Sequence, residues 1–264
     1  MSHVGVDLAW GSRARSGIAV VDRDGRLISA ASVLTDEEIL AVIRSQVARG
    51  DVVAFDAPLI VTNDSGARAC ERALARDFAR FGAGPHPTNL GRPHMHPEPR
   101  AMRLARQAGL TSDPRARFTG REPVAIEVYP HPAMVSWFSL STIIPYKAKA
   151  GRDVAARQEA FTSLLRHVLR FLGGPMDLSH SPDWERLVHE VAIATRHVQL
   201  NRAEDELDAI CCAHLAWLWA TQPGDLAVYG DAQGFIVTPR PPAPQAGNRR
   251  NQAVSARHSS SPVD

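Results

Sequence analysis

Short apolar runs and turn residues alternate over the first part of the chain. Residues 4–10, 17–22 and 26–33 are rich in valine, isoleucine and alanine, as strands are. Asp24-Gly25 between the last two runs is a tight-turn pair, so the three runs predict an antiparallel meander. Asp7 lies within the first run, where an unpaired charge is costly. It therefore needs a metal ion or a cationic group as partner, unless it caps a turn at the end of the strand.

A helix and a fourth strand follow the meander. Thr35 and Glu38 have the spacing of a capping box, and apolar residues then recur at helical spacing until Gly50. Residues 52–55 are entirely apolar, which is typical of a strand that is covered on both faces. Because a helix connects this strand to the meander, we expect it to run parallel to the first strand.

The second half of the chain predicts one further strand and several helices. Residues 124–130 form the fifth strand. An amphipathic helix begins at Arg152 and ends at Gly173-Gly174-Pro175. A looser helical region covers residues 184–198, and a last long helix covers residues 204–219.

The end of the chain predicts a hairpin and a tail. Residues 227–229 and 234–237 are short apolar runs on either side of a Gly-Asp turn, whereas residues 239–264 have the composition of a disordered segment. We therefore expect one α/β domain over residues 1–238. It combines a mixed five-stranded sheet and flanking helices with an insertion at about residues 62–122 and extra C-terminal strands.

The insertion is rich in arginine. It holds eleven arginines, six acidic residues and no lysine. Residues 65–81 predict a helix, and a stripe at four-residue spacing on it consists of Arg68, Arg72, Arg76 and Arg80. Such a stripe is either a solvated helix face or a phosphate-binding face near carboxylates. His94 and His96 form a weak metal pair, because prolines flank them and no cysteine is near.

Composition limits the partners and the cellular compartment that we expect for the protein. The formal charge of the 264 residues is only +2, so a nucleic acid would have to bind to a local basic surface. Cys70, Cys211 and Cys212 form neither a disulfide framework nor a zinc motif. No apolar run approaches the roughly 20 residues that span a bilayer. We expect a soluble, cytoplasmic protein without a membrane partner.

Acidic residues recur inside or just after the predicted strands and at the predicted start of the last helix. These candidate catalytic residues are Asp7, Asp56, Glu127, Asp205 and Asp208. The last two share a helix face at the predicted N-terminus, where the helix dipole favours negative charge. Sites form at the carboxyl ends of parallel strands, so the acids are expected to converge there. Clustered carboxylates bind divalent cations, and an oxygen ligand set favours Mg²⁺ or Mn²⁺ over zinc.

Four segments carry a resemblance to a known family. They are Gly5-Val6-Asp7, Ala54-Phe55-Asp56-Ala57-Pro58-Leu59, Glu127-Val128-Tyr129-Pro130 and Glu204-Asp205-Glu206-Leu207-Asp208-Ala209. Over residues 3–238 the chain resembles an uncharacterised family of unknown function that is described as predicted RNase H-like nucleases. More distantly, it is similar to RuvC-like resolvases. The resemblance implies metal ligands at Asp7, Asp56 and Asp205 or Asp208, whereas Glu127 matches a motif of the uncharacterised family and no RNase H ligand.

Basic residues are candidates for holding a substrate. Arg68, Arg72 and Lys147 suit phosphate contacts, because guanidinium groups bind phosphate bidentately and a lysine between two loops reaches a scissile group. Arg72 is equally suited to an ion pair that holds the insertion in place. His131 is a candidate general acid or base, or a packed side chain. Trp10 is expected either to stack on a base at the mouth of the site or to pack in the core.

We expect a metal-dependent nuclease or phosphodiesterase with Mg²⁺ or Mn²⁺ as cofactor and a nucleic acid or nucleotide as substrate. Two alternatives remain open. A non-catalytic module would hold nucleic acid or a nucleotide on the arginine-rich insertion and would bind it without the carboxylates. A sugar- or acetate-kinase-like phosphotransferase would use residues 11–17 as a phosphate loop, but it gives the acids at 205 and 208 no use.

Overall fold

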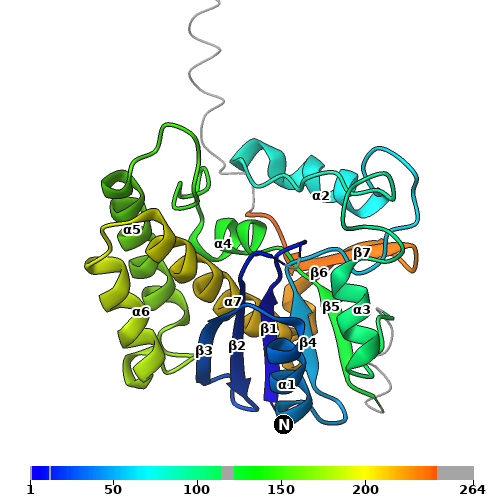
Figure 1. The fold of residues 1–264 in the computed structure, drawn as a ribbon, viewed down its shortest axis with the longest axis horizontal. Helices are drawn as coiled ribbons and strands as arrows, with labels where there is room; N and C mark the ends of the chain where they lie inside the picture. The colour runs from blue at the N-terminus through cyan, green and yellow to red at the C-terminus, as the bar shows by residue number, and fades with distance from the viewer. Residues whose placement is uncertain (1, 12, 114–121, 243–264) are drawn as a thin grey trace, which may run out of the picture.

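The chain folds around a mixed five-stranded sheet. The computed structural model describes residues 2–11, 13–113 and 122–242. Its strands are β1 (Ser2–Asp7), β2 (Ser16–Asp22), β3 (Leu27–Val33), β4 (Val52–Phe55) and β5 (Val124–Glu127). Their order is β3-β2-β1-β4-β5, with β2 antiparallel to both of its neighbours and β4 parallel to β1 and β5 (Figure 1). The predicted meander, crossover helix and parallel fourth strand are confirmed, and the predicted fifth strand is present and runs parallel to β4.

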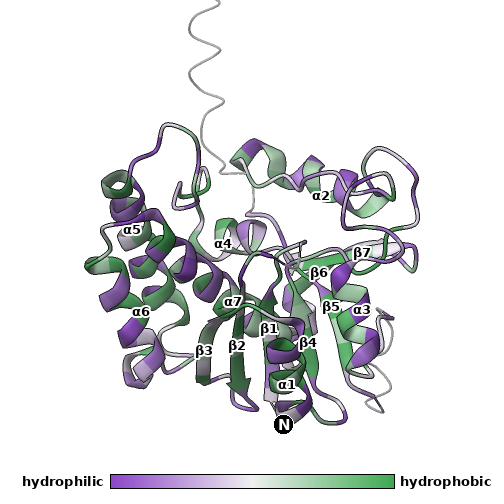
Figure 2. Cartoon of the chain, viewed as in Figure 1, coloured by the Kyte–Doolittle hydropathy of each residue, from purple (hydrophilic) through white to green (hydrophobic). Residues whose placement is uncertain are grey.

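Helices cover both faces of the sheet. They are α1 (Asp36–Gln46), α2 (Ala69–Phe78), α3 (Arg100–Gln107), α4 (Pro130–Phe138), α5 (Val154–Leu172), α6 (Pro182–Ala192) and α7 (His197–Thr221). On β2, Ile18 and Val20 join a core with α1 and α3, whereas Ala19 and Val21 join a core with α5, α6 and α7. The alternation of side chains along the strand therefore separates two cores. Figure 2 shows hydrophobic residues concentrated on the sheet and both polar and apolar residues on α5 and α6.

Two glycines allow α7 to lie directly against the sheet. A Cβ atom on Gly5 of β1 would lie 2.1 Å from the backbone nitrogen of Ala213. A Cβ atom on Gly17 of β2 would lie 1.7 Å from the carbonyl oxygen of Asp205. No larger residue fits at either position without a shift of the helix backbone. These glycines therefore fix how close the acidic residues of α7 come to the end of β1.

A second, two-stranded sheet follows α7. It consists of β6 (Leu226–Asp231) and β7 (Gly234–Pro239), which pair antiparallel and confirm the predicted hairpin. Phe235 and Val237 of β7 share a buried cluster with Ile126 of β5. The predicted disordered tail starts too early, because Pro239 still pairs in β7, and residues 243–264 of that tail lie outside the described residues. Within the described part of the chain, no helix has both the length and the apolar character needed to cross a membrane.

Several predicted boundaries are wrong. The strand β1 ends at Asp7 and β5 ends at Glu127, so both acids terminate their strands instead of lying inside them. The predicted helix over 65–81 is shorter, because α2 covers Ala69–Phe78 and only a 3-10 turn follows it. The looser helical region ends at Ala192. Each difference lies at an element end, where local sequence signals are weakest.

The last helix begins earlier than predicted, at His197. The side chain of Gln199 accepts a hydrogen bond of 2.9 Å from the backbone nitrogen of Arg196 and so caps this end. Asp205 and Asp208 consequently lie more than two turns inside α7. The dipole argument for their negative charge is therefore wrong, since the dipole acts within the first turn.

Candidate metal centre

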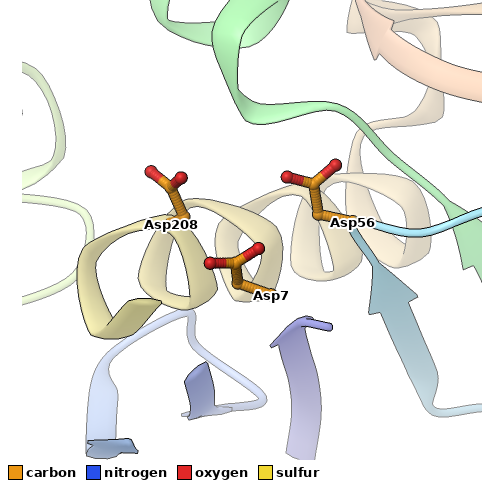
Figure 3. A group of neighbouring side chains, drawn as sticks. All are labelled: Asp7, Asp56 and Asp208. Carbon is orange, nitrogen blue, oxygen red and sulfur yellow. The ribbon is translucent and has the colours of Figure 1, made fainter. Parts of the chain in front are cut away.

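Three carboxylates from three elements meet at the carboxyl end of the sheet. Asp7 ends β1, Asp56 directly follows β4, and Asp208 lies on α7 (Figure 3). One oxygen atom from each lies within 4.8 Å of the other two. The backbone nitrogen of Asp56 donates to the carbonyl oxygen of Val6 at 2.8 Å, which continues the parallel ladder past the strand end. The pairing of β1 with β4 thus brings Asp7 and Asp56 together, and the packing of α7 adds Asp208.

Burial disfavours negative charge on the aspartates of this group. Asp208 has no exposed surface, and Asp7 and Asp56 are partly buried. Burial raises the pKa of Asp7 well above its usual value, and Asp208 and Asp56 raise it further. Burial, with Asp208 and Glu127 adding to it, also raises the pKa of Asp56 to about 7. Asp7 and Asp56 are therefore hard to ionise while their neighbours are charged and no further cation is present.

Two side chains from the loop before α5 contact Asp208. The hydroxyl of Tyr146 donates to its Oδ1 atom at 2.7 Å, and the ammonium of Lys147 lies 2.7 Å from its Oδ2 atom. Burial opposes the charge of Lys147, but Asp208, Asp7 and Asp56 together raise its pKa well above the usual value. Lys147 is therefore a fixed positive charge in the carboxylate group. Sequence reasoning selected Lys147 for phosphate contacts but missed this pair and Tyr146.

Two further acids on α7 lie beside the group of three. Glu204 contacts Arg157 at 2.9 Å and Lys147 at 3.9 Å. The Asp205 carboxylate accepts a hydrogen bond of 3.4 Å from the hydroxyl of Ser32, and Asp205 is not one of the three converging acids. Burial raises the pKa of both Glu204 and Asp205 to about 7. Of the two helix acids predicted as metal ligands, Asp208 thus belongs to the cluster and Asp205 lies next to it. Glu204 was not predicted.

Glu127 and Arg68 form a buried ion pair. The Arg68 guanidinium donates to both Glu127 oxygens, at 2.8 and 2.5 Å, and its Nε atom donates to Glu71 at 2.8 Å. The backbone nitrogen of Leu59 donates to Glu127 at 3.0 Å. Burial raises the pKa of Glu127, and Arg68 counteracts this rise. Glu127 therefore lies outside the group of three, and Arg68 anchors the start of α2 with little surface left for a phosphate.

The other two predicted substrate residues differ in position. Arg72 lies exposed on α2, donates to the carbonyl oxygen of Ala67, and does not line the cavity at the carboxylates. His131 lines that cavity, and its Nδ1 atom lies 3.4 Å from the hydroxyl of Tyr129. Burial and the charge of Lys147 lower the pKa of His131 to about 4. His131 is therefore neutral at pH 7 and able both to donate and to accept a hydrogen bond.

A cavity of about 290 Å³ opens at the carboxylates. Asp7, Asp56, Lys147, Trp10 and His131 are among the residues that line it. The cavity is large enough for a group of nucleotide size, and it presents acidic oxygens, one ammonium, a neutral imidazole and the guanidinium of Arg68, which Glu127 already pairs. Such a set is suited to holding a hard divalent cation and a phosphate side by side.

The donor set fits a divalent cation of the Mg²⁺ or Mn²⁺ type. All three converging ligands are carboxylate oxygens, which hard cations prefer, and no cysteine or histidine belongs to the group. A single ammonium balances only part of the charge of three ionised aspartates. A bound divalent ion would supply the rest and would lower the raised pKa of Asp7 and Asp56.

Comparison with known proteins identifies a family but no characterised relative. No curated protein matches the chain, and no solved structure matches it. A family model described as a protein of unknown function, DUF429, matches residues 5–234. The match includes all three converging aspartates, the last three residues of β1 and the whole of β2 to β5. The chain therefore belongs to the DUF429 family of proteins of unknown function.

Proposed function

We propose that the protein is a metal-dependent nuclease or phosphodiesterase. The observation that carries the proposal is the convergence of Asp7, Asp56 and Asp208, from two parallel strands and a packed helix, to within 4.8 Å. These three residues would hold Mg²⁺ or Mn²⁺. The bound ion would activate water and stabilise the charge that develops on a phosphodiester during hydrolysis.

The side chains around the carboxylates support phosphate chemistry. Lys147 has about a third of its side chain exposed (36%), and its ammonium faces the same cavity as Asp7 and Asp56. It is the residue that would hold an oxygen of the substrate phosphate against the metal centre. His131, neutral at pH 7, lines the same cavity and would donate or accept a hydrogen bond there.

Calorimetry with Mn²⁺ and Mg²⁺ tests the metal centre. We expect the wild type to bind one of these ions and Asp7→Asn to lose that binding, because the substitution removes a ligand and a negative charge. Asp24→Asn is the matched control, since Asp24 is exposed in the turn between β2 and β3, at the opposite end of the sheet. Absence of divalent-ion binding by the wild type would refute the proposal.

Cleavage assays on the same samples test the chemistry. Single-stranded, duplex and branched DNA and RNA serve as substrates, with bis(p-nitrophenyl) phosphate as a small diester. We expect metal-dependent hydrolysis of at least one substrate by the wild type and by Asp24→Asn. Asp7→Asn and Asp56→Asn are expected to lose it by a factor of about 100 or more.

One observation favours a second candidate, a nucleic-acid or nucleotide binding module without catalysis. The ammonium of Lys147 already lies 2.7 Å from Asp208, at the place where the carboxylates need a cation. A protein in which this ammonium takes the role of the ion would hold its phosphate ligand without metal. Ligand binding that is unchanged by chelators and by Asp7→Asn would support this candidate over the hydrolase.

A further inference from the structure

A second cavity adjoins the one at the carboxylates. It has a volume of about 280 Å³ and is lined by Trp10, His94, His96, Pro97, Glu98, Arg100 and Arg103. Trp10 lines both cavities, so the two lie next to each other at this residue. Its partly buried side chain packs against the core on the α1 side of the sheet. Trp10 therefore lies between a cavity that Asp7 and Asp56 line and a cavity that residues of the insertion line.

Guanidinium groups give the second cavity a positive side. Arg100 and Arg103 of α3 both contact the Asp36 carboxylate, at 2.7 Å each. Arg100 is buried and also donates to the carbonyl oxygens of Ala9 and Gly11, so it fixes the loop that carries Trp10. Arg103 is 39% exposed at its side chain. Its guanidinium is thus the accessible cation of this wall, held in place by Asp36.

Two exposed histidines and one acid also line the second cavity. The imidazole of His94 lies over Gly11, where a Cβ atom would come within 3.3 Å of its Cε1 atom. His96 follows two residues later, and Glu98 is neutralised by Arg106 at 2.7 Å. The sequence pattern indicated only a weak metal pair at these two histidines. The structure places them instead with an indole and two guanidiniums, which is a set for flat rings and phosphates.

We propose that this second cavity binds the nucleotide next to the scissile phosphodiester of a single-stranded nucleic acid. The inference rests on the proposed function and adds the substrate class to it. The neighbouring base would stack against Trp10 and the imidazole of His94, and Arg103 would contact its phosphate. A base is free to enter in this way only when it is unpaired.

Binding is measured without metal, so that the result does not depend on the carboxylate site. Fluorescence anisotropy follows fluorescein-labelled single-stranded DNA and RNA 12-mers in EDTA, over a series of salt concentrations. Trp10→Leu, which keeps apolar bulk but removes the ring, is expected to weaken binding about ten-fold. Trp10→Phe, which keeps an aromatic face, is expected to retain most of the affinity. Thermal melting confirms that both variants fold.

The salt series tests the phosphate contact. Arg103→Met is expected to reduce the slope of log K against log salt by about 0.7, the value for one phosphate contact on a single strand. Arg44→Met is the matched control, because it removes the same charge from the surface of α1 and lines neither cavity. Its slope should equal that of the wild type.

Three results would overturn the inference. They are wild-type affinity in Trp10→Leu, an unchanged slope in Arg103→Met, and duplex DNA that binds as tightly as the single strand. Failure of the proposed function gives a different result. The protein would then bind no divalent ion and cleave no substrate, while its oligonucleotide binding would still depend on Trp10 and Arg103.

Discussion

The ammonium of Lys147 lies 2.7 Å from the Oδ2 atom of Asp208, the only fully buried carboxylate among the three that converge. Asp208 is held on its other oxygen by the hydroxyl of Tyr146. A positive charge is therefore built into the candidate metal centre. A divalent ion that enters has to share Asp208 with this ammonium or displace it, and both cases make ion affinity depend on Lys147.

We expect Lys147→Met to bind Mn²⁺ more tightly than the wild type, by about ten-fold, because one competing positive charge is removed from the ligand group. Without metal, the variant should be less stable by about 1–3 kcal/mol, since Asp208 loses its ionic partner. Calorimetry gives the first quantity and thermal melting in EDTA the second. Lys149→Met, two residues along the same loop and exposed, is the control. Weaker Mn²⁺ binding by Lys147→Met would contradict this account.

The metal-free protein should lose stability as the pH rises from 5 to 8. The pKa values of Asp56, Glu204 and Asp205 are raised to about 7 in the folded state, whereas in the unfolded chain they lie near 4. Between about pH 4 and pH 7 the folded state binds more protons than the unfolded state, so the free energy of unfolding falls as the pH rises. Their contribution is fully present below about pH 4 and is lost through pH 7. Melting temperatures in EDTA at pH 5 and 8 measure the effect.

Substitution of one of these acids isolates the cause. We expect Asp56→Asn to melt at a higher temperature than the wild type at pH 8 in EDTA, because an amide needs no proton to be neutral. The difference between the two proteins should be smaller at pH 5. The same variant should lose Mn²⁺ binding. Equal pH dependence of melting in both proteins would show that Asp56 is already ionised at pH 5.

The predictable part of the fold is the part that local sequence determines. The capping box of Thr35 and Glu38, the apolar run at 52–55 and the Asp24-Gly25 turn each act within a few residues, and each is found in the structure. The start of α7 was missed because its N-cap residue, Arg196, is not a usual capping residue, and the side chain of Gln199 caps this end instead.

The candidate site was only partly predictable, for a different reason. Acids at strand ends converge because parallel strands place their carboxyl ends together, so Asp7 and Asp56 follow from topology. The ion-pair partners of Asp208 and Glu127 do not follow from topology, because these partners, Lys147 and Arg68, lie about 60 residues away along the chain. Helical spacing placed Arg68 on the same stripe as Arg72. Only tertiary packing buries the first and exposes the second.

Arg68→Met should destabilise the protein without changing its metal stoichiometry. The substitution leaves Glu127 and Glu71 buried without their common cation, which costs about 3–5 kcal/mol for a buried pair. Arg72→Met, one turn along α2 and exposed, should change the free energy of unfolding by less than about 0.5 kcal/mol. Urea denaturation measures both values. A change in the number of Mn²⁺ ions bound by Arg68→Met would instead place Glu127 among the metal ligands.

Gly5→Ala tests how closely α7 must approach the sheet to form the site. The new methyl group would lie 2.1 Å from the backbone nitrogen of Ala213 and 2.2 Å from the carbonyl oxygen of Ala209. Both contacts are with backbone, so no side-chain rotation relieves them, and the helix must move away from β1. We expect a loss of about 3 kcal/mol or more in the free energy of unfolding.

The same movement should weaken Mn²⁺ binding, because α7 carries Asp208 away from Asp7. Gly174→Ala is the matched control, since a Cβ atom there has no neighbour within 4 Å, and it should leave unfolding and ion binding unchanged. Urea denaturation and calorimetry on the two variants separate stability from ligand geometry. If Gly5→Ala is destabilised but binds Mn²⁺ as the wild type does, the ion does not depend on Asp208, and Asp7 and Asp56 alone hold it.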